Sequence, residues 1–270
     1  MKKLGLILLV AGIVLMAGCA GDDPAGPSGT LADVTGLTIN TSSSGRNVDM
    51  SWNAVDDVDG YKVYFRETTT ADWIEGADVT SGTSGTHVNA TSAGYYTVKA
   101  YKGTNTSANN SNVENTLPTV VSTTYTIYDN YSIATQPSGF IFGETSGQTG
   151  SAISTSFKQD IYAFDEDAPL RGDNTVRLYS GTLSPYGNGN TTHMAEPAAA
   201  GYCELYGTGS WYPNYGLYAG DVRVFLHLQN GHYVKMYNIV VTPDPATTNG
   251  TMVSFSYEIQ TDGLTLFTSN

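Results

Sequence analysis

The chain has 270 residues, which is long enough for two domains of ordinary size. Its formal net charge of -13 argues against nucleic acid as a partner and against a polybasic contact with a membrane surface. Only 14% of the residues are charged, and Ser, Thr, Asn, Gly and 19 Tyr supply the polarity instead, as in many extracellular β-proteins.

The N-terminus has the parts of a bacterial export signal. Lys2 and Lys3 form a short positive region, and a mainly apolar run follows from Leu4 to Met16. This run has the length of a signal-peptide core and is too short to cross a hydrocarbon layer of ~30 Å as a stable helix. Two small residues then lead into Cys19. Removing the two lysines with the signal takes the formal net charge from -13 to -15.

The stretch from Leu15 to Cys19, Leu-Met-Ala-Gly-Cys, resembles the lipobox of bacterial lipoproteins. The resemblance implies that residues 1–18 are a signal peptide and that Cys19 becomes the lipid-modified N-terminus of the mature protein. Several acyl chains together give stable anchoring, because each buried methylene contributes ~0.8 kcal/mol. An ordinary secretory signal that happens to contain a cysteine is the alternative.

Residues 19–32 are rich in Gly, Pro and Asp and have too few apolar groups to fold, so we expect a flexible tether. Ala20, rather than Asp, follows the lipidated cysteine. By the sorting pattern known for lipoproteins this favours the outer membrane, and it leaves open which face of that membrane the protein occupies. Because lipidation uses Cys19, Cys203 has no intramolecular disulfide partner, and we expect it to be a buried small apolar residue.

Residues 33–117 consist of short alternating segments separated by turn signals, which is typical of an all-β domain. The expected strands are Val34–Ile39, Val48–Trp52, Tyr61–Arg66 and Tyr95–Tyr101. Two segments, 56–60 and 82–86, read as turns. His87 has no second metal ligand at a useful spacing and is expected on a surface strand.

Four of these segments resemble strands A, B, C and F of a fibronectin type III module: Leu37–Ile39, Ser51–Asn53, Gly60–Tyr64 and Tyr96–Ala100. Residues 107–112 suit the approach to strand G. The resemblance implies a sandwich with Trp52 in its core and with Tyr95 or Tyr96 as the corner tyrosine that hydrogen-bonds backward. Such modules are spacers or binding platforms, and a spacer that lifts the next domain from the membrane is the simpler interpretation.

Pro118 closes the first module, and residues 119–270 form a second β-rich region. The expected strands are Tyr125–Tyr128, Gly139–Phe142, Asp160–Phe164, Val176–Tyr179, Val222–Leu228, Tyr233–Val241 and Met252–Ile259. Asn230-Gly231 lies between two alternating runs and predicts a hairpin. The fold class is therefore all-β, a fibronectin type III (Ig-like) sandwich followed by a second antiparallel β-rich domain.

The runs Phe225–Lys235 and Met252–Tyr257 resemble the end of HmuY-type haemophore-like lipoproteins, and Phe157–Tyr162 is similar to their aspartate-containing strand. Those proteins are β-rich outer-membrane lipoproteins, and the known ones capture haem. The resemblance implies little about the ligand, because haem ligation in that family rests on residues outside this hairpin.

Haem needs an axial pair, commonly His or Met. His193 and Met194 lie in a Gly/Asn/Thr-rich segment that reads as a loop, where a ligand is reachable. His227 and His232 flank the Asn-Gly turn, and strict alternation places His227 opposite the apolar face, toward solvent. Surface histidines with no ligand are the alternative for all three.

Residues 201–220 are dense in aromatic residues and glycine. Aromatic faces stack on sugar rings and other flat ligands, so Trp211, Tyr212 and Tyr215 form a candidate platform for a glycan or a protein. Packing over the end of the β-structure is the alternative. The acidic run 165–167, with Asp160 and Asp173 near it, lacks the order of a dedicated calcium loop and is expected to be a solvated turn rather than a metal site.

No Gly-x-Ser-x-Gly, no His-Glu-x-x-His and no phosphate-cradling glycine loop is present, so we predict a protein that is not an enzyme and has no cofactor, haem being the alternative. Three hypotheses follow for a lipid-anchored envelope protein. It is a binding or adhesion protein for glycan or protein, a haem-capturing protein, or a structural component that binds other envelope proteins.

Overall fold

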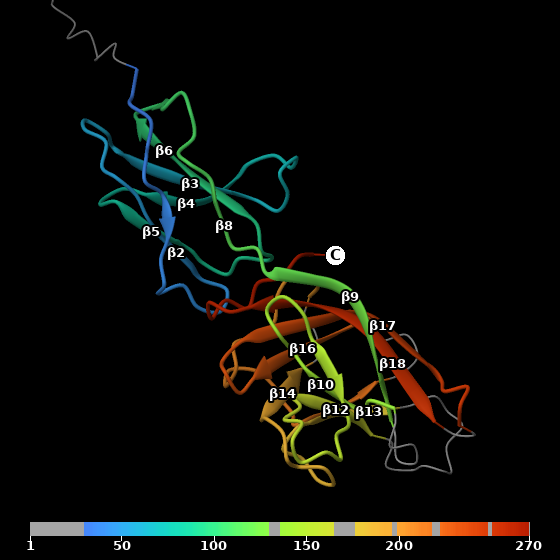
Figure 1. Cartoon of the computed structure of the whole chain (residues 1–270). Helices are drawn as coiled ribbons and strands as arrows, with labels where there is room; N and C mark the ends of the chain where they lie inside the picture. Colours follow the sequence, from blue (N-terminus) through green and yellow to red (C-terminus); the bar gives the residue numbers. More distant parts are fainter. Residues whose placement is uncertain are drawn as a thin grey trace, which may run out of the picture. The chain divides into compact units, whose positions relative to one another are not determined.

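The computed structural model describes residues 30–129, 136–164, 176–195, 199–217, 222–247 and 250–269. Within these ranges Leu31–Asn270 forms one compact unit whose regular structure is all β-strand (Figure 1). The predicted signal peptide, Cys19, most of the tether, the acidic run 165–167 and Asp173 lie outside the described residues. Among the residues that are described, none belongs to a helix with the length and apolar character needed to cross a bilayer.

The first half of the unit is a sandwich of eight short strands. They are β1 (Thr38–Ile39), β2 (Val48–Ser51), β3 (Gly60–Arg66), β4 (Ile74–Val79), β5 (Ser84–His87), β6 (Tyr95–Lys102), β7 (Asn105–Thr106) and β8 (Glu114–Asn115). One sheet has the order β1-β2-β5 and the other β4-β3-β6-β7, with β8 also paired to β6. This is the A-B-E and C′-C-F-G arrangement of a fibronectin type III sandwich, so that prediction is confirmed.

Two expectations for this sandwich are wrong. Residues 84–86, expected in a turn, belong to β5, because they pair with β2 to complete the three-stranded sheet. His87 is half-buried rather than on the surface, with its ring 5.4 Å from that of Phe65 and 5.7 Å from that of Tyr96. The Tyr96 hydroxyl lies 3.1 Å from His87 Nδ1, so this tyrosine reaches back to a histidine ring. The predicted burial of Trp52 is confirmed.

In the second half, the described residues form two five-stranded antiparallel sheets. Their strands are β9 (Thr119–Tyr128), β10 (Gly139–Ile141), β11 (Gln148–Gly150), β12 (Ile161–Phe164), β13 (Val176–Ser180), β14 (Thr192–Ala195), β15 (Asn214–Leu217), β16 (Arg223–Leu228), β17 (Tyr233–Pro243) and β18 (Thr251–Gln260). The sheet orders are β11-β10-β12-β13-β15 and β14-β16-β17-β18-β9. The predicted hairpin joins β16 to β17, and Gly231 supplies the positive φ of 87° that its turn needs.

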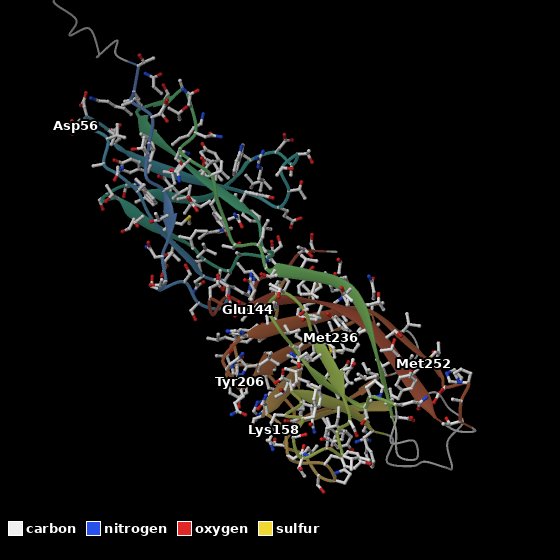
Figure 2. All side chains as sticks on the ribbon, viewed as in Figure 1. Asp56, Glu144, Lys158, Tyr206, Met236 and Met252 are labelled. Atoms are coloured by element: carbon white, nitrogen blue, oxygen red, sulfur yellow. The ribbon has the colours of Figure 1, made fainter. Side chains whose placement is uncertain are left out.

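One hydrophobic core lies between these two sheets, because alternate residues of strands in both face it. From β16 it receives Val224, Leu226 and Leu228, as the alternation predicts. Aromatic rings fill the part between β10 and β18, where the Phe140 and Phe255 centroids are 5.0 Å apart in an edge-on arrangement. In Figure 2, Met236 marks this interior and Tyr206 marks the surface of the same sandwich.

The segment after β18 contributes to the first sandwich. Leu264 and Leu266 are fully buried members of the core that contains Trp52. The backbone of this segment is also hydrogen-bonded to the first sandwich: Gly45 N donates to Gly263 O, and Ala93 N donates to Phe267 O. The core of the first sandwich therefore includes residues that lie far beyond Pro118 in the chain, while the predicted division at Pro118 itself stays a prediction.

A buried ion pair holds the same segment against β17 and β18. Lys235 and Glu258 are paired across these strands, with side chains only 1% and 4% exposed and Nζ 3.7 Å from Oε1. Lys235 Nζ donates to the Thr268 carbonyl at 2.7 Å, and Thr268 N donates to Glu258 Oε2 at 3.0 Å. Burial lowers the pKa of Lys235 although Glu258 opposes this shift. Such a pair is tolerated in an interior only when further hydrogen bonds satisfy its charges, and Thr268 supplies them.

Replacing Leu266 with Ala is expected to destabilise the protein by about 2–5 kcal/mol, because it leaves a cavity in the core of the first sandwich. The free energy of unfolding from denaturant titration measures this. Val120→Ala is the matched control, since Val120 is 51% exposed and its truncation is expected to change stability by less than about 0.5 kcal/mol. Equal effects of the two substitutions would show that the segment after β18 is not part of the core.

Candidate binding site

The expected loop around His193 is a strand. Residues 192–195 form β14, an edge strand that pairs with β16, with His193 opposite His227 and Met194 opposite Leu226. Neighbouring residues on a strand face opposite sides of the sheet. Met194 is accordingly fully buried in the core, whereas His193 is half-buried on the outer side. The two side chains proposed as an axial pair therefore do not reach the same space.

The other edge of β14 is bound by the aromatic segment. Met194 N donates to Tyr212 O at 2.7 Å, and Tyr212 N donates to Met194 O at 2.9 Å. Two residues later the chain enters β15, whose partner β13 belongs to the other sheet. Residues 212–214 thus pass from the edge of one sheet to the edge of the other. Because neighbouring residues of an extended chain point to opposite sides, the rings of Trp211 and Tyr212 face different surfaces.

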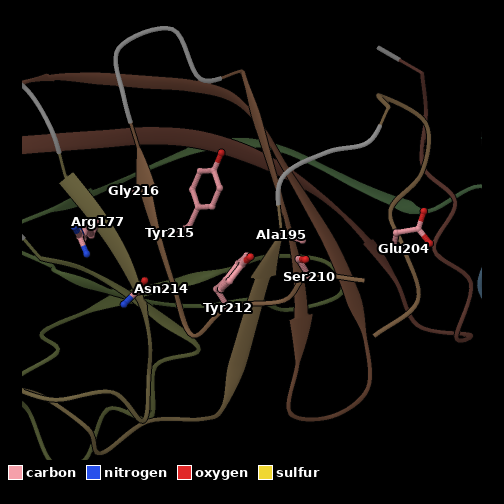
Figure 3. A pocket seen from close by; sticks show the side chains of 8 residues that line it. All are labelled: Arg177, Ala195, Glu204, Ser210, Tyr212, Asn214, Tyr215 and Gly216. Atoms are coloured by element: carbon pink, nitrogen blue, oxygen red, sulfur yellow. The ribbon is translucent and has the colours of Figure 1, made fainter. Parts of the chain in front are cut away.

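A pocket of about 600 Å³ opens beside this crossing. Its wall is formed by residues of β13, β14, β15 and the segment before β15: Arg177, Ala195, Glu204, Ser210, Tyr212, Asn214, Tyr215 and Gly216. Figure 3 shows the rings of Tyr212 and Tyr215 between Arg177 on one side and Glu204 on the other. Two of the three residues predicted to form a platform therefore line one pocket.

The pocket combines aromatic and polar groups. Tyr212 is 54% exposed, whereas Tyr215 is half-buried and packs against the core of its sandwich. Arg177 brings a guanidinium, Glu204 a carboxylate, and Asn214 an amide that both donates and accepts hydrogen bonds. Such a mixture suits a neutral or zwitterionic polar ligand that also has an apolar face.

Trp211, the third predicted platform residue, faces away from the pocket. Its ring lies 6.0 Å from that of Tyr206, 6.3 Å from that of His227 and 6.1 Å from that of Tyr233. Its Nε1 atom is buried without a hydrogen-bond partner among the residues described. Trp211 therefore packs in an aromatic layer over the outer face of β16 and β17, which was the alternative interpretation for this segment.

Sequence reasoning missed Tyr206, which covers two histidines of this layer. Its ring stacks on His227 at 4.4 Å with an interplanar angle of 8°, and it lies 4.6 Å from His193. Strict alternation placed His227 on the correct face of β16, but the solvent exposure expected for it is wrong because Tyr206 and Trp211 cover it. The cross-strand pairing of His193 with His227 would have identified this cluster if β14 had been recognised as a strand.

The electrostatics of this layer follow from burial. Burial lowers the pKa of His193 and of His227, and the neighbouring His193 lowers that of His227 further. Cys203 is buried with Phe225, Tyr233 and Phe267, as expected, and burial raises the pKa of its thiol well above the ordinary range. The thiol is thus protonated and inert at neutral pH.

Asp160 and His232, which the sequence also singled out, contact neighbouring loops and turns. Asp160 is buried, accepts hydrogen bonds from Asn190 Nδ2 and Phe142 N at 2.8 Å each, and has a pKa raised by burial. His232 lies beside the hairpin turn, with Nδ1 3.2 Å from Asn230 Nδ2. In the described part of the chain no three His, Cys, Asp or Glu side chains come together as a metal cluster.

No protein-family model matches the chain, and no curated protein matches it in sequence. Among solved structures, an Fn3-like protein from Clostridium thermocellum is similar at 25% identity and a TM-score of 0.28, covering 32% of this chain and 90% of that one. The FN1-FN3 domains of chicken CNTN1 are similar at 9% identity and a TM-score of 0.30, covering 88% of this chain and 64% of that one. The fold assignment rests on the strand order described above.

The stability of the protein is expected to fall as the pH drops below about 6.5, the ordinary histidine value. Because His193 and His227 have lowered pKa values in the folded state, the unfolded chain takes up their protons first, so their stabilising contribution is present above that value and lost below it. Free energies of unfolding measured at about pH 7.5 and about pH 5.5 test this. The double variant His193→Asn/His227→Asn should lose less stability than the wild type, and His232→Asn is the matched control. An unchanged fall in the double variant would contradict the expectation.

Proposed function

We propose that this chain is a lipid-anchored, non-catalytic binding protein of the cell envelope, whose second sandwich binds a saccharide in the pocket lined by Tyr212 and Tyr215. The observation that carries this proposal is the pocket itself, where an exposed tyrosine ring lies among an arginine, a carboxylate and an amide. The fibronectin type III-like sandwich supports a binding or structural role, because such folds commonly present or space binding surfaces.

The faces and the hydroxyl-bearing edges of a sugar ring both find suitable groups in the pocket. Sugar rings have apolar C–H faces that pack on aromatic rings, and Tyr212 offers such a ring. Their hydroxyl edges need donors and acceptors, which Asn214, Ser210 and Glu204 provide. The volume of about 600 Å³ lies within the roughly 300–1,000 Å³ usual for pockets that bind small ligands.

The anchor is proposed from the N-terminal sequence. A lipobox-like stretch ending at Cys19, a tether to residue 32 and Ala20 after the cysteine support an outer-membrane lipoprotein. In this proposal the first sandwich is the spacer between the lipid and the binding domain. The membrane is a partner only through the acyl chains, since the net charge of the mature chain, which falls from -13 to -15 when the two lysines of the signal are removed, disfavours contact with anionic headgroups.

Haem capture is the second candidate, in line with the resemblance to HmuY-type lipoproteins. The position of His193, half-buried on β14 with His227 opposite it, favours this candidate. Met194 cannot serve with His193 because it is buried in the core. A structural envelope component is the reading that remains if neither a saccharide nor haem binds.

The Cys19→Ser variant is expected to stay unlipidated and to partition into the aqueous phase. Metabolic labelling with a palmitate analogue, followed by detergent phase separation, measures both effects. Wild-type protein should label and enter the detergent phase, because its acyl chains bury many methylenes. Cys203→Ser is the matched control, since Cys203 is buried and free. Equal labelling of Cys19→Ser and wild type would rule out the anchor.

The Tyr212→Ala variant is expected to weaken saccharide binding roughly tenfold, equivalent to about 1.4 kcal/mol, because the exposed aromatic wall is lost. An array of neutral and acidic oligosaccharides identifies the ligand, and titration calorimetry gives its affinity. Tyr64→Ala, on β3 of the first sandwich, is the matched control and should bind as the wild type does. If no oligosaccharide binds, or if both variants bind equally, the pocket is not a saccharide site.

A further inference from the structure

Strand β4 of the first sandwich lies at the edge of its sheet, next to β3. Among the described residues, no strand or loop backbone other than β3 pairs with residues 74–79. The neighbour of β4 across the sandwich is β5, which is the edge strand of the other sheet (Figure 1). A sheet edge of this kind presents a row of N–H and C=O groups to which another extended chain can pair.

The face of β4 that points into the sandwich is incompletely covered at its beginning. Ile74 is directly opposite Phe65 in the antiparallel register, so the two side chains share one face of the sheet. Phe65 is 7% exposed and belongs to the core, whereas Ile74 is 66% exposed. An apolar side chain on the inner face is therefore left in contact with water.

A second pocket, of about 320 Å³, lies at the same place. Its wall includes Phe65 and Ile74, together with Gly76 of β4, His87 at the end of β5, and Thr91 beyond it. Because strands of both sheets form this wall, the pocket lies on the inner side of β4. Its volume is at the lower end of the roughly 300–1,000 Å³ usual for binding pockets, which suits one or two aliphatic side chains.

The charge around β4 favours a basic occupant. The residues of β4 and of the pocket wall include four carboxylates, those of Glu67, Asp72, Glu75 and Asp78. They include one guanidinium, that of Arg66, and Lys62 of β3 pairs with Glu75 at 2.8 Å. Carboxylates are still in excess, so a positively charged chain is attracted to this edge and an acidic one is repelled.

The same excess disfavours two other occupants. When the β4 strands of two copies pair antiparallel over their full length, Glu75 of one copy lies opposite Asp78 of the other. Like charges directly opposite each other destabilise a pair of strands, so a second copy is a poor partner. The tether of residues 19–32 contains Asp22 and Asp23 and no Lys or Arg, so it does not match the edge either.

We propose that β4 binds an extended basic segment of another protein as an added strand, with an aliphatic side chain of that segment in the pocket beside Ile74. Successive side chains of a strand point to opposite faces, so one set enters the pocket and the other lies on the outer face. Glu75 and Asp78 lie on that outer face, opposite Tyr64 and Lys62 of β3. Lys or Arg in the added strand can therefore form cross-strand pairs of opposite charge there.

Peptide titration tests the proposal on a chain starting at Leu31, which keeps the whole compact unit. The probes are hexapeptides in which Val alternates with Lys, with Ser or with Glu. We expect saturable binding of the Val-Lys peptide, about tenfold weaker binding of the Val-Ser peptide, and no binding of the Val-Glu peptide, since two or three charge pairs together are worth about this factor. Amide hydrogen exchange of residues 74–79 should slow when the Val-Lys peptide binds, because edge amides become hydrogen-bonded.

A Val-Lys peptide N-methylated at every backbone nitrogen separates strand addition from general attraction to an acidic protein. It keeps all its charges but cannot donate hydrogen bonds from its backbone, so we expect it not to bind. Ile74→Ala should weaken binding of the unmodified Val-Lys peptide about tenfold, because an apolar wall of the pocket is lost. Val240→Ala, on β17, is the matched control, since Val240 is 53% exposed and far from β4 in the sheet order. Both truncated side chains are exposed, so both variants are expected to fold.

Three results would overturn the proposal: no saturable binding of the Val-Lys peptide, equal binding of its N-methylated form, or equal weakening by Val240→Ala. Concentration-dependent dimerisation of the chain without peptide, abolished by Ile74→Ala, would assign the edge to a second copy instead. Tyr212→Ala should bind the Val-Lys peptide normally, so failure of the saccharide pocket and failure of this edge are separately visible.

Discussion

The arrangement of side chains around the pocket of the second sandwich depends on the two backbone hydrogen bonds between Met194 and Tyr212, at 2.7 and 2.9 Å. They add Tyr212 to the sheet beyond its edge strand β14. They also hold the chain extended just before it enters β15 of the other sheet. Alternation along β14 and along residues 211–212 then follows from backbone geometry. For the residues beside this isolated bridge, the backbone register decides whether a side chain faces the core, the aromatic layer or the pocket.

This arrangement explains how adjacent residues acquire unrelated environments. Met194 is in the core while His193 is in the aromatic layer, and Tyr212 is in the pocket while Trp211 stacks near His227. A cluster of aromatic residues in a sequence therefore does not define a single surface. Which rings come together depends on the strands that pair with each other, here β14 with β16 and Met194 with Tyr212. These partners lie many residues apart along the chain.

Strands with regular alternation of apolar residues could be predicted from the sequence with nearly correct bounds, as β3, β16 and β18 show. One face of each of these strands is buried, so apolar residues recur at every second position, and this pattern is visible in the sequence. The short strands β14 and β15 have little such periodicity, since Thr-His-Met-Ala and Asn-Tyr-Gly-Leu contain few β-branched or aromatic residues on one side. They are strands because neighbouring edges offer hydrogen-bond partners, and that is tertiary context. Because the candidate sites depend on these two strands, the sequence indicated the residues of the sites but not how they are grouped.

The participation of Leu264 and Leu266 in the first sandwich has a consequence for the order of folding. During synthesis the residues of β1 to β8 are present long before these two leucines. The first core therefore stays incomplete until Leu264 and Leu266 have been added. An incomplete core leaves the early segment only marginally ordered, because the buried apolar surface is what offsets the entropy of ordering. The first sandwich therefore reaches its native form only when the chain through residue 266 is present.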